Sequence, residues 1–123
     1  MGAIPDFKVD VQQRGRLRIV AVAGEVDVLT APQLGAAVDD EEAYDDLVVD
    51  LSSVPFMSSV GLGLISSINR RQTRRGRGFA LAGVKGDVER LLEITGLTDT
   101  LTVGDSVSAA IDLLRGSGGY YDT

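Results

Sequence analysis

The chain of 123 residues contains no histidine, no cysteine and no tryptophan, and only three prolines. Without histidine and cysteine it has no imidazole base, no thiol nucleophile, no disulfide and none of the usual zinc or haem ligand sets. These absences remove most familiar classes of enzyme. We therefore expect a protein that is not an enzyme, with no catalytic residues, no metal site and no cofactor of its own.

Long hydrophobic runs are also missing. No apolar stretch approaches the roughly 20 residues that span a bilayer, and residues 1–8 have neither the basic region nor the apolar core of a secretion signal. We expect a cytoplasmic protein that does not contact a membrane. The formal net charge of −6 argues against nucleic acid as a partner, because binding to a duplex depends on neutralising its phosphates. The expected partner is another protein.

What the sequence does contain is a hydrophobic period that switches repeatedly between two and about 3.6 residues. A chain of this length is enough for one domain. Strands separated by helices lie parallel, with right-handed crossovers, whereas the turn at residues 13–16 is short enough for an antiparallel hairpin. The expected strands cover residues 7–11, 17–26, 47–51, 79–84 and 101–103. The pattern predicts a single α/β domain over residues 1–115, with a mixed sheet of about five strands and about four packed helices, and a flexible tail over 116–123.

Capping residues mark where the helices should begin and end. The segment Thr30-Ala31-Pro32-Gln33 has the spacing of a capping box, with proline in the first turn. Asp87 is expected to cap the third helix, which Gly96 should stop, and Asp105 or Ser106 is expected to cap the last.

Two clusters of charge allow two interpretations each. Arginines gather at the end of the second main helix, and acids gather after the first. Both can be solvated helix ends, or the arginines can form an electrostatic patch for an acidic protein surface. The clusters are Arg70, Arg71, Arg74, Arg75 and Arg77, and Asp39 to Glu42 with Asp45 and Asp46.

The most informative motif is Phe-Met-Ser-Ser-Val-Gly-Leu-Gly at residues 56–63, between an apolar strand and an amphipathic helix. It places a serine pair where a helix starts, and we expect its glycines to let a partner approach the backbone. The amides of the first helical turn have no partner within the helix, and the helix dipole favours anions. A phosphate could be bound or attached here. Alternatively, one serine is an N-cap and the other is simply solvated.

Taken together, the motifs resemble those of the STAS domains, and among these the bacterial anti-sigma factor antagonists. Residues 24–27, Gly-Glu-Val-Asp, look like the family's Gly-x-Leu/Ile-Asp. Residues 48–52 resemble its central strand, and residues 94–97 resemble its late Gly-Leu turn. The serine motif is similar to the family's Phe-Met-Asp-Ser-Ser/Thr-Gly-Leu-Gly. In an ungapped match the family's phosphorylated serine falls on Ser59, with Ser58 in the position of the family's acid and as the fallback target.

The resemblance implies a protein that, when unphosphorylated, binds an anti-sigma factor of the ATPase-related serine kinase type and releases its sigma factor. Phosphorylation by that kinase, which holds the ATP and magnesium, would end the complex, and a phosphoserine phosphatase would restore it. The family also suggests a monomer. The partner-binding residues implied are Asp27, Ser58, Ser59, Val60, Gly61 and Leu62. Asp27 can alternatively be a turn aspartate at the end of a strand.

Two other functions fit the same sequence. STAS domains also serve as fixed subunits of transporters and other complexes without phosphorylation. A sensor of small molecules is a third interpretation, although no set of polar pocket residues can be identified from the sequence.

Overall fold

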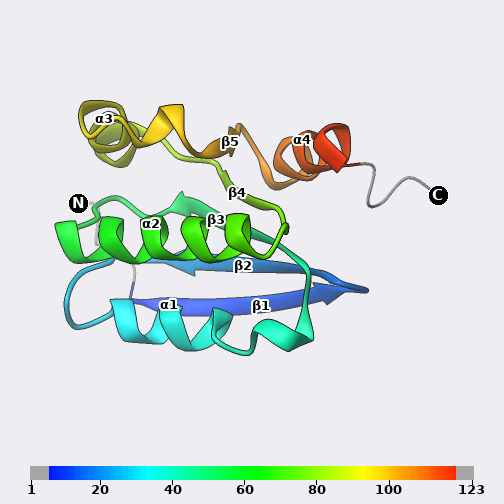
Figure 1. The fold of residues 1–123 in the computed structure, drawn as a ribbon. Coiled ribbons are helices and arrows are strands. Elements are labelled where there is room, and N and C mark those ends of the chain that lie inside the picture. Colours follow the sequence, from blue (N-terminus) through cyan, green and yellow to red (C-terminus); the bar gives the residue numbers. More distant parts are fainter. Residues whose placement is uncertain (1–5, 119–123) are drawn as a thin grey trace.

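The structure is a computed structural model that describes residues 6–118, with side chains up to residue 116. Five strands and four α-helices alternate after an initial hairpin (Figure 1). In chain order they are β1 (Lys8–Arg14), β2 (Leu17–Ala23), α1 (Ala31–Val38), β3 (Asp46–Ser53), α2 (Ser59–Arg74), β4 (Phe79–Ala82), α3 (Gly86–Ile94), β5 (Thr102–Gly104) and α4 (Val107–Gly118).

The strands form one mixed sheet in the order β1-β2-β3-β4-β5. β1 and β2 pair antiparallel, and Gly15 makes the turn between them at a φ of 58°, a conformation that costs glycine little. The other neighbouring strands pair parallel, with Val48 between Ile19 and Ala80. The predicted α/β domain, with its antiparallel start and parallel continuation, is confirmed.

Alternating strand residues divide the core between the two faces of the sheet. Val20, Val49 and Leu51 face a core to which α1, α2 and α3 contribute. Ile19 and Val48 face the opposite way and pack with residues of α4. Because successive side chains of a strand point to opposite faces, the unbroken apolar runs at residues 19–23 of β2 and 47–49 of β3 are what a sheet covered on both sides requires.

The helix ends differ from the prediction in two places. Thr30 makes no side-chain cap to α1, so the predicted capping box is wrong. Asp87 lies within the first turn of α3, whose N-cap position is Lys85, so the predicted cap is also wrong. The helix dipole still stabilises the negative charge of Asp87 in that turn. Ser106 does cap α4, because its Oγ accepts a hydrogen bond from the Ala109 amide at 3.1 Å. Gly96, at a φ of 75°, follows the end of α3 as predicted.

Three segments between or beyond the expected elements are helical. Short 3-10 turns over Glu41–Ala43 and Leu97–Asp99 were not predicted. α4 extends to Gly118, past the predicted start of the tail at Gly116. The rest of that predicted tail, residues 119–123, lies outside the described residues.

The topology brings three connections to one edge of the sheet. Parallel strands end at a common edge, and in open α/β sheets this edge is where binding sites form. The connections that follow β2, β3 and β4 all leave from it, and α1 and α2 begin at the same end of the molecule, at the left of Figure 1. The serine motif therefore lies at the edge of the sheet where the fold class places its sites.

Candidate functional site

A short parallel bridge joins the connection after β2 to the serine motif. Val26 and Met57 pair, the Val26 amide donates to the Phe56 carbonyl at 3.0 Å, and the Ser58 amide donates to the Val26 carbonyl at 2.8 Å. Asp27 is the next residue after this bridge on one side, and Ser58 is the next on the other. The structure thus brings together the two parts of the site that the sequence separates by thirty positions.

Asp27 organises the turn that leads into α1. One of its carboxylate oxygens accepts hydrogen bonds from the Leu29 amide at 2.9 Å and the Thr30 amide at 3.1 Å. The Thr30 hydroxyl is engaged in the same turn, accepting from the Asp27 amide at 2.9 Å and donating to the Glu25 carbonyl at 2.7 Å. This explains why Thr30 does not cap the helix. Asp27 therefore has the structural role of a turn aspartate and also lies beside the serine pair.

The two serines occupy different environments. Ser58 is the N-cap residue of α2, with an extended backbone and its carbonyl accepting from the Leu62 amide at 3.0 Å, but its side chain makes no cap hydrogen bond. Its Oγ is buried and has no hydrogen-bond partner among the described residues. Ser59, the first residue of α2, is exposed. Of the pair, Ser59 is the exposed residue.

This difference has a measurable effect on stability. Replacing an N-cap serine by alanine usually costs about 1 kcal/mol. We expect Ser58→Ala to change the free energy of unfolding by less than about 0.5 kcal/mol, because it removes a buried hydroxyl that makes no bond. Ser106→Ala is the matched control, and it should show the usual loss, since the Ser106 hydroxyl does cap its helix. Urea denaturation measures both, and equal losses would show that the Ser58 hydroxyl is bonded after all.

The remaining predicted site residues divide into exposed and buried. Val60 is about half exposed and stands beside Ser59. Gly61 and Leu62 are buried, so they can support the surface but offer little of it. A Cβ on Gly61 would lie 2.6 Å from the Met57 Cγ and 2.9 Å from the Val26 Cγ1, whereas one on Gly63 would meet nothing within 4 Å. Gly61 serves the internal packing of α2 rather than the approach of a partner, and only Gly63 fits the original interpretation.

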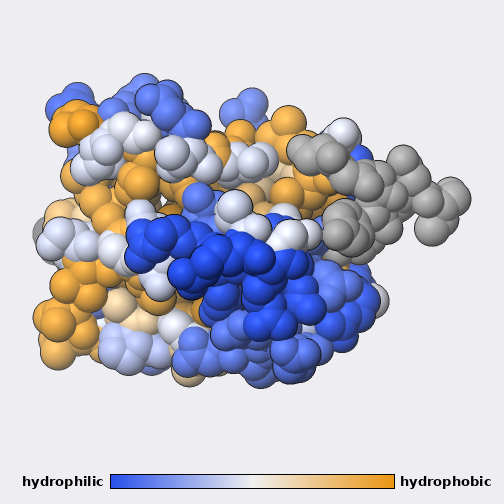
Figure 2. Space-filling view, in the orientation of Figure 1, coloured by the Kyte–Doolittle hydropathy of each residue, from blue (hydrophilic) through white to orange (hydrophobic). Residues whose placement is uncertain are grey.

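Exposed apolar side chains lie in the segments next to Asp27 and Ser58 and at the end of α3, and the sequence prediction did not include them. Leu29 is 82% exposed and Ile94 73%, and Val28 and Phe56 are also exposed. Figure 2 shows apolar surface gathered at the end of the molecule where α1 and α2 begin (left), with strongly hydrophilic surface over the opposite ends of those helices. For Val28, Leu29 and Phe56 the available signal was a large apolar residue in a connection, outside any strand or helix, whereas Ile94 ends α3. Apolar patches rimmed by polar residues mark interaction surfaces.

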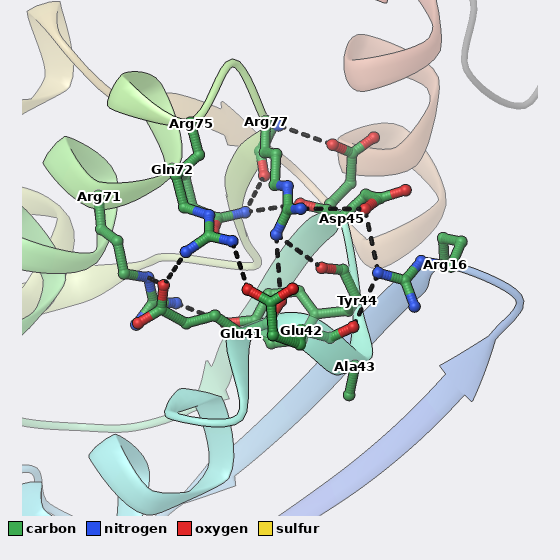
Figure 3. Close-up of polar contacts among 12 residues, drawn as sticks. Arg16, Glu41, Glu42, Ala43, Tyr44, Asp45, Arg71, Gln72, Arg75 and Arg77 are labelled. Atoms are coloured by element: carbon green, nitrogen blue, oxygen red, sulfur yellow. Dashed lines mark hydrogen bonds and ion pairs between the residues drawn. The ribbon is translucent and has the colours of Figure 1, made fainter.

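The charged clusters meet at the far end of α2, away from the serines. Arg75 pairs with Glu41 at 2.5 Å and with Glu42 at 2.7 Å, and the Arg77 guanidinium donates to the Glu41 carbonyl at 3.1 Å and the Tyr44 carbonyl at 3.2 Å (Figure 3). Arg71 donates to the Tyr44 hydroxyl. The interpretation as a free electrostatic patch is therefore wrong for Arg71, Arg75 and Arg77. They hold the segment between α1 and β3.

Tyr44 and Asp46 are the buried anchors of this segment. Burial raises the pKa of Tyr44, and its hydroxyl donates to the Val38 carbonyl at 2.6 Å. Asp46, expected among the solvated acids, is 1% exposed and accepts a hydrogen bond from the Gly78 amide at 2.6 Å. Among the described residues no group of histidine, cysteine, aspartate or glutamate could hold a metal ion. Nor does any helix of that part of the chain have the length and hydropathy to cross a membrane.

The fold and the site define a STAS domain. The STAS domain model matches residues 8–110, and the chain belongs to this family. The resemblance inferred from the motifs is thereby confirmed.

Within the family, the chain is similar to proteins named for a regulatory role. It is 31% identical over 101 residues to the anti-sigma-B factor antagonist of Listeria monocytogenes, a match covering 80% of this chain and 89% of that protein. It is 29% identical over 102 residues to the protein of the same name from Staphylococcus aureus, covering 81% of this chain and 94% of the relative. The crystal structure of an anti-sigma factor antagonist from Mycobacterium paratuberculosis superposes with a TM-score of 0.79 at 27% identity, covering 94% of this chain and 99% of that one.

Proposed function

We propose that this protein is an anti-sigma factor antagonist that is switched by phosphorylation of Ser59. In its unphosphorylated form it binds an anti-sigma factor of the ATPase-related serine kinase type in the cytoplasm, as a monomer, and frees the sigma factor. The relatives from Listeria monocytogenes and Staphylococcus aureus are named anti-sigma-B factor antagonists and match most of the chain, which supports the antagonist role. The observation that carries the site assignment is the exposed Ser59 at the start of α2, beside a buried Ser58 hydroxyl.

The physical chemistry of the helix start fits a switch that acts on the interface and leaves the fold intact. A phosphoserine adds about −1.5 to −2 charges at neutral pH. At the N-terminus of α2 such a charge is stabilised by roughly 0.3 to 2 kcal/mol. The domain stays folded, and the free energy of binding becomes less favourable, because the partner's surface must approach the new charge. A phosphatase that removes the phosphate would restore binding.

Labelling by the partner tests this function. Each ATPase-type anti-sigma factor of the host is mixed with the protein, magnesium and radiolabelled ATP. We expect one of them to label the wild type and not Ser59→Ala, because Ser59 is the exposed hydroxyl of the pair.

Two results would contradict the proposal. Undiminished labelling of Ser59→Ala would move the modification to Ser58. No labelling of the wild type by any of these kinases would exclude the switch. In the second case, co-purification of a membrane ATPase from the native host would favour the alternative of a fixed transporter subunit.

A further inference from the structure

A groove that includes the first two residues of the serine motif lies beside the predicted site and shares no residue with it. Its volume is about 250 Å³. Two segments of the chain form it: the residues just before Ser58, and residues of α3. Its lining residues are Phe56, Met57, Asp87, Arg90, Leu91 and Ile94.

The groove has an apolar floor and protruding apolar walls. Met57 is buried and Leu91 is half-buried against the main core. Phe56 is 46% exposed, and Ile94 is more exposed than Phe56. Isolated exposed apolar residues are ordinary, but two that line the same concave apolar surface form a place that an apolar group can fill. The volume is below the roughly 300 to 1,000 Å³ of small-molecule pockets, and it suits a single side chain better.

Two opposite charges flank this apolar surface. Asp87 and Arg90 are exposed, lie three positions apart on α3, and make no ion pair with any described residue. Charges at the rim of an interface contribute to orientation and partner choice more than to affinity. An occupant that carries a basic and an acidic residue on either side of an apolar one would complement the groove.

Resting on the proposed function, we propose that this groove binds one large apolar side chain of the anti-sigma factor, flanked on the partner by a basic and an acidic residue. The groove is continuous with the surface around Ser59 through Phe56 and Met57, so a partner that covers Ser59 also reaches it. A second copy of this chain is a poorer occupant, because it would cover the serine that the kinase must reach. The partner's apolar side chain, held in this groove, is an anchor of the kind that dominates binding energy in protein interfaces.

Truncation of the two walls tests the proposal. The binding constant of the anti-sigma factor that captures the wild type is measured by calorimetry without ATP, for Phe56→Ala, Ile94→Ala and the double variant. We expect each single variant to bind about 30-fold more weakly, the factor that corresponds to 2 kcal/mol. The double variant should lose less than the product of the two, because both changes remove contacts with one side chain.

Leu113→Ala is the matched control, since Leu113 is as exposed as Phe56 but belongs to α4 on the opposite face of the sheet. It should bind like the wild type, and urea denaturation should show all variants folded. If the wild type binds and both wall variants bind as tightly as the wild type, the groove proposal is wrong and the proposed function stands. If no anti-sigma factor binds the wild type, both fail. If the truncations abolish self-association in sedimentation and leave partner binding unchanged, the groove is a contact between copies.

Discussion

Ser59→Glu should weaken binding of the anti-sigma factor by about 100-fold or more while leaving the protein folded. A negative charge at residue 59 and a partner carboxylate about 5 Å away repel each other by about 3 kcal/mol at an effective dielectric constant of about 20. Each 1.4 kcal/mol corresponds to a tenfold change in affinity. Within the protein the same glutamate occupies the first turn of α2, where the helix dipole favours it by roughly 0.3 to 1 kcal/mol. Calorimetric titration and urea denaturation of one sample measure both effects.

The control is Ser67→Glu, which adds the same charge to the same helix. Ser67 is exposed and lies about two turns further along α2, outside the apolar surface around Ser59. Its affinity for the partner should be close to that of the wild type. If both glutamate variants weaken binding equally, the effect comes from net charge and not from the position of Ser59. If neither weakens it, the helix start is not in the interface.

Much of the fold follows from local information. The switching hydrophobic period located the strands and helices, and the rule that parallel strands end at one edge predicts that the segments after β2 and β3 are neighbours. The bridge between Val26 and Met57 is the realisation of that rule. The sequence assigned Asp27 to the surface of the serine pair only through the family resemblance, and the bridge supplies the physical reason for their proximity.

Other features depend on contacts that the spacing of residue types does not reveal. The acids after α1 and the arginines at the end of α2 looked like two solvated clusters, but Arg75 pairs with Glu41 and Glu42 across more than thirty positions. Thr30 has the right spacing for a capping box, yet its hydroxyl is used by the turn of Asp27. Tertiary structure brings the arginines to their partners, whereas Thr30 bonds within its own turn in place of the helix cap.

The buried Ser58 hydroxyl and the tight packing of Gly61 connect the site to the core. The start of α2 lies over Val26 and Met57, both nearly fully buried, so the position of Ser59 depends on how closely the helix backbone approaches them. Only a residue without a Cβ allows this approach. The two glycines of the motif thus have separate roles, and the same substitution should distinguish them.

Gly61→Ala should destabilise the protein relative to Gly63→Ala by about 1 to 3 kcal/mol, the usual cost of overpacking a core. Both changes replace glycine by alanine in the same helix, which stabilises the helix by roughly 0.5 to 1 kcal/mol in each variant. The difference between the two free energies of unfolding therefore measures the steric clash alone. A Cβ on Gly61 would overlap Met57 and Val26, and these buried side chains have little room to move, whereas a Cβ on Gly63 enters open space. Urea denaturation should therefore show Gly63→Ala at or above wild-type stability and Gly61→Ala below it.

The same pair separates packing from recognition. If the clash shifts the first turn of α2, Gly61→Ala should also bind the anti-sigma factor more weakly, because Ser59 and Val60 move with that turn. Gly63 is exposed on the same helix, so Gly63→Ala reports whether the partner itself approaches the backbone there. Weaker binding by a fully stable Gly63→Ala would mean that the interface extends along α2 beyond the serines. Equal stability of the two variants would mean that α2 does not pack as closely on Met57 as the structure shows.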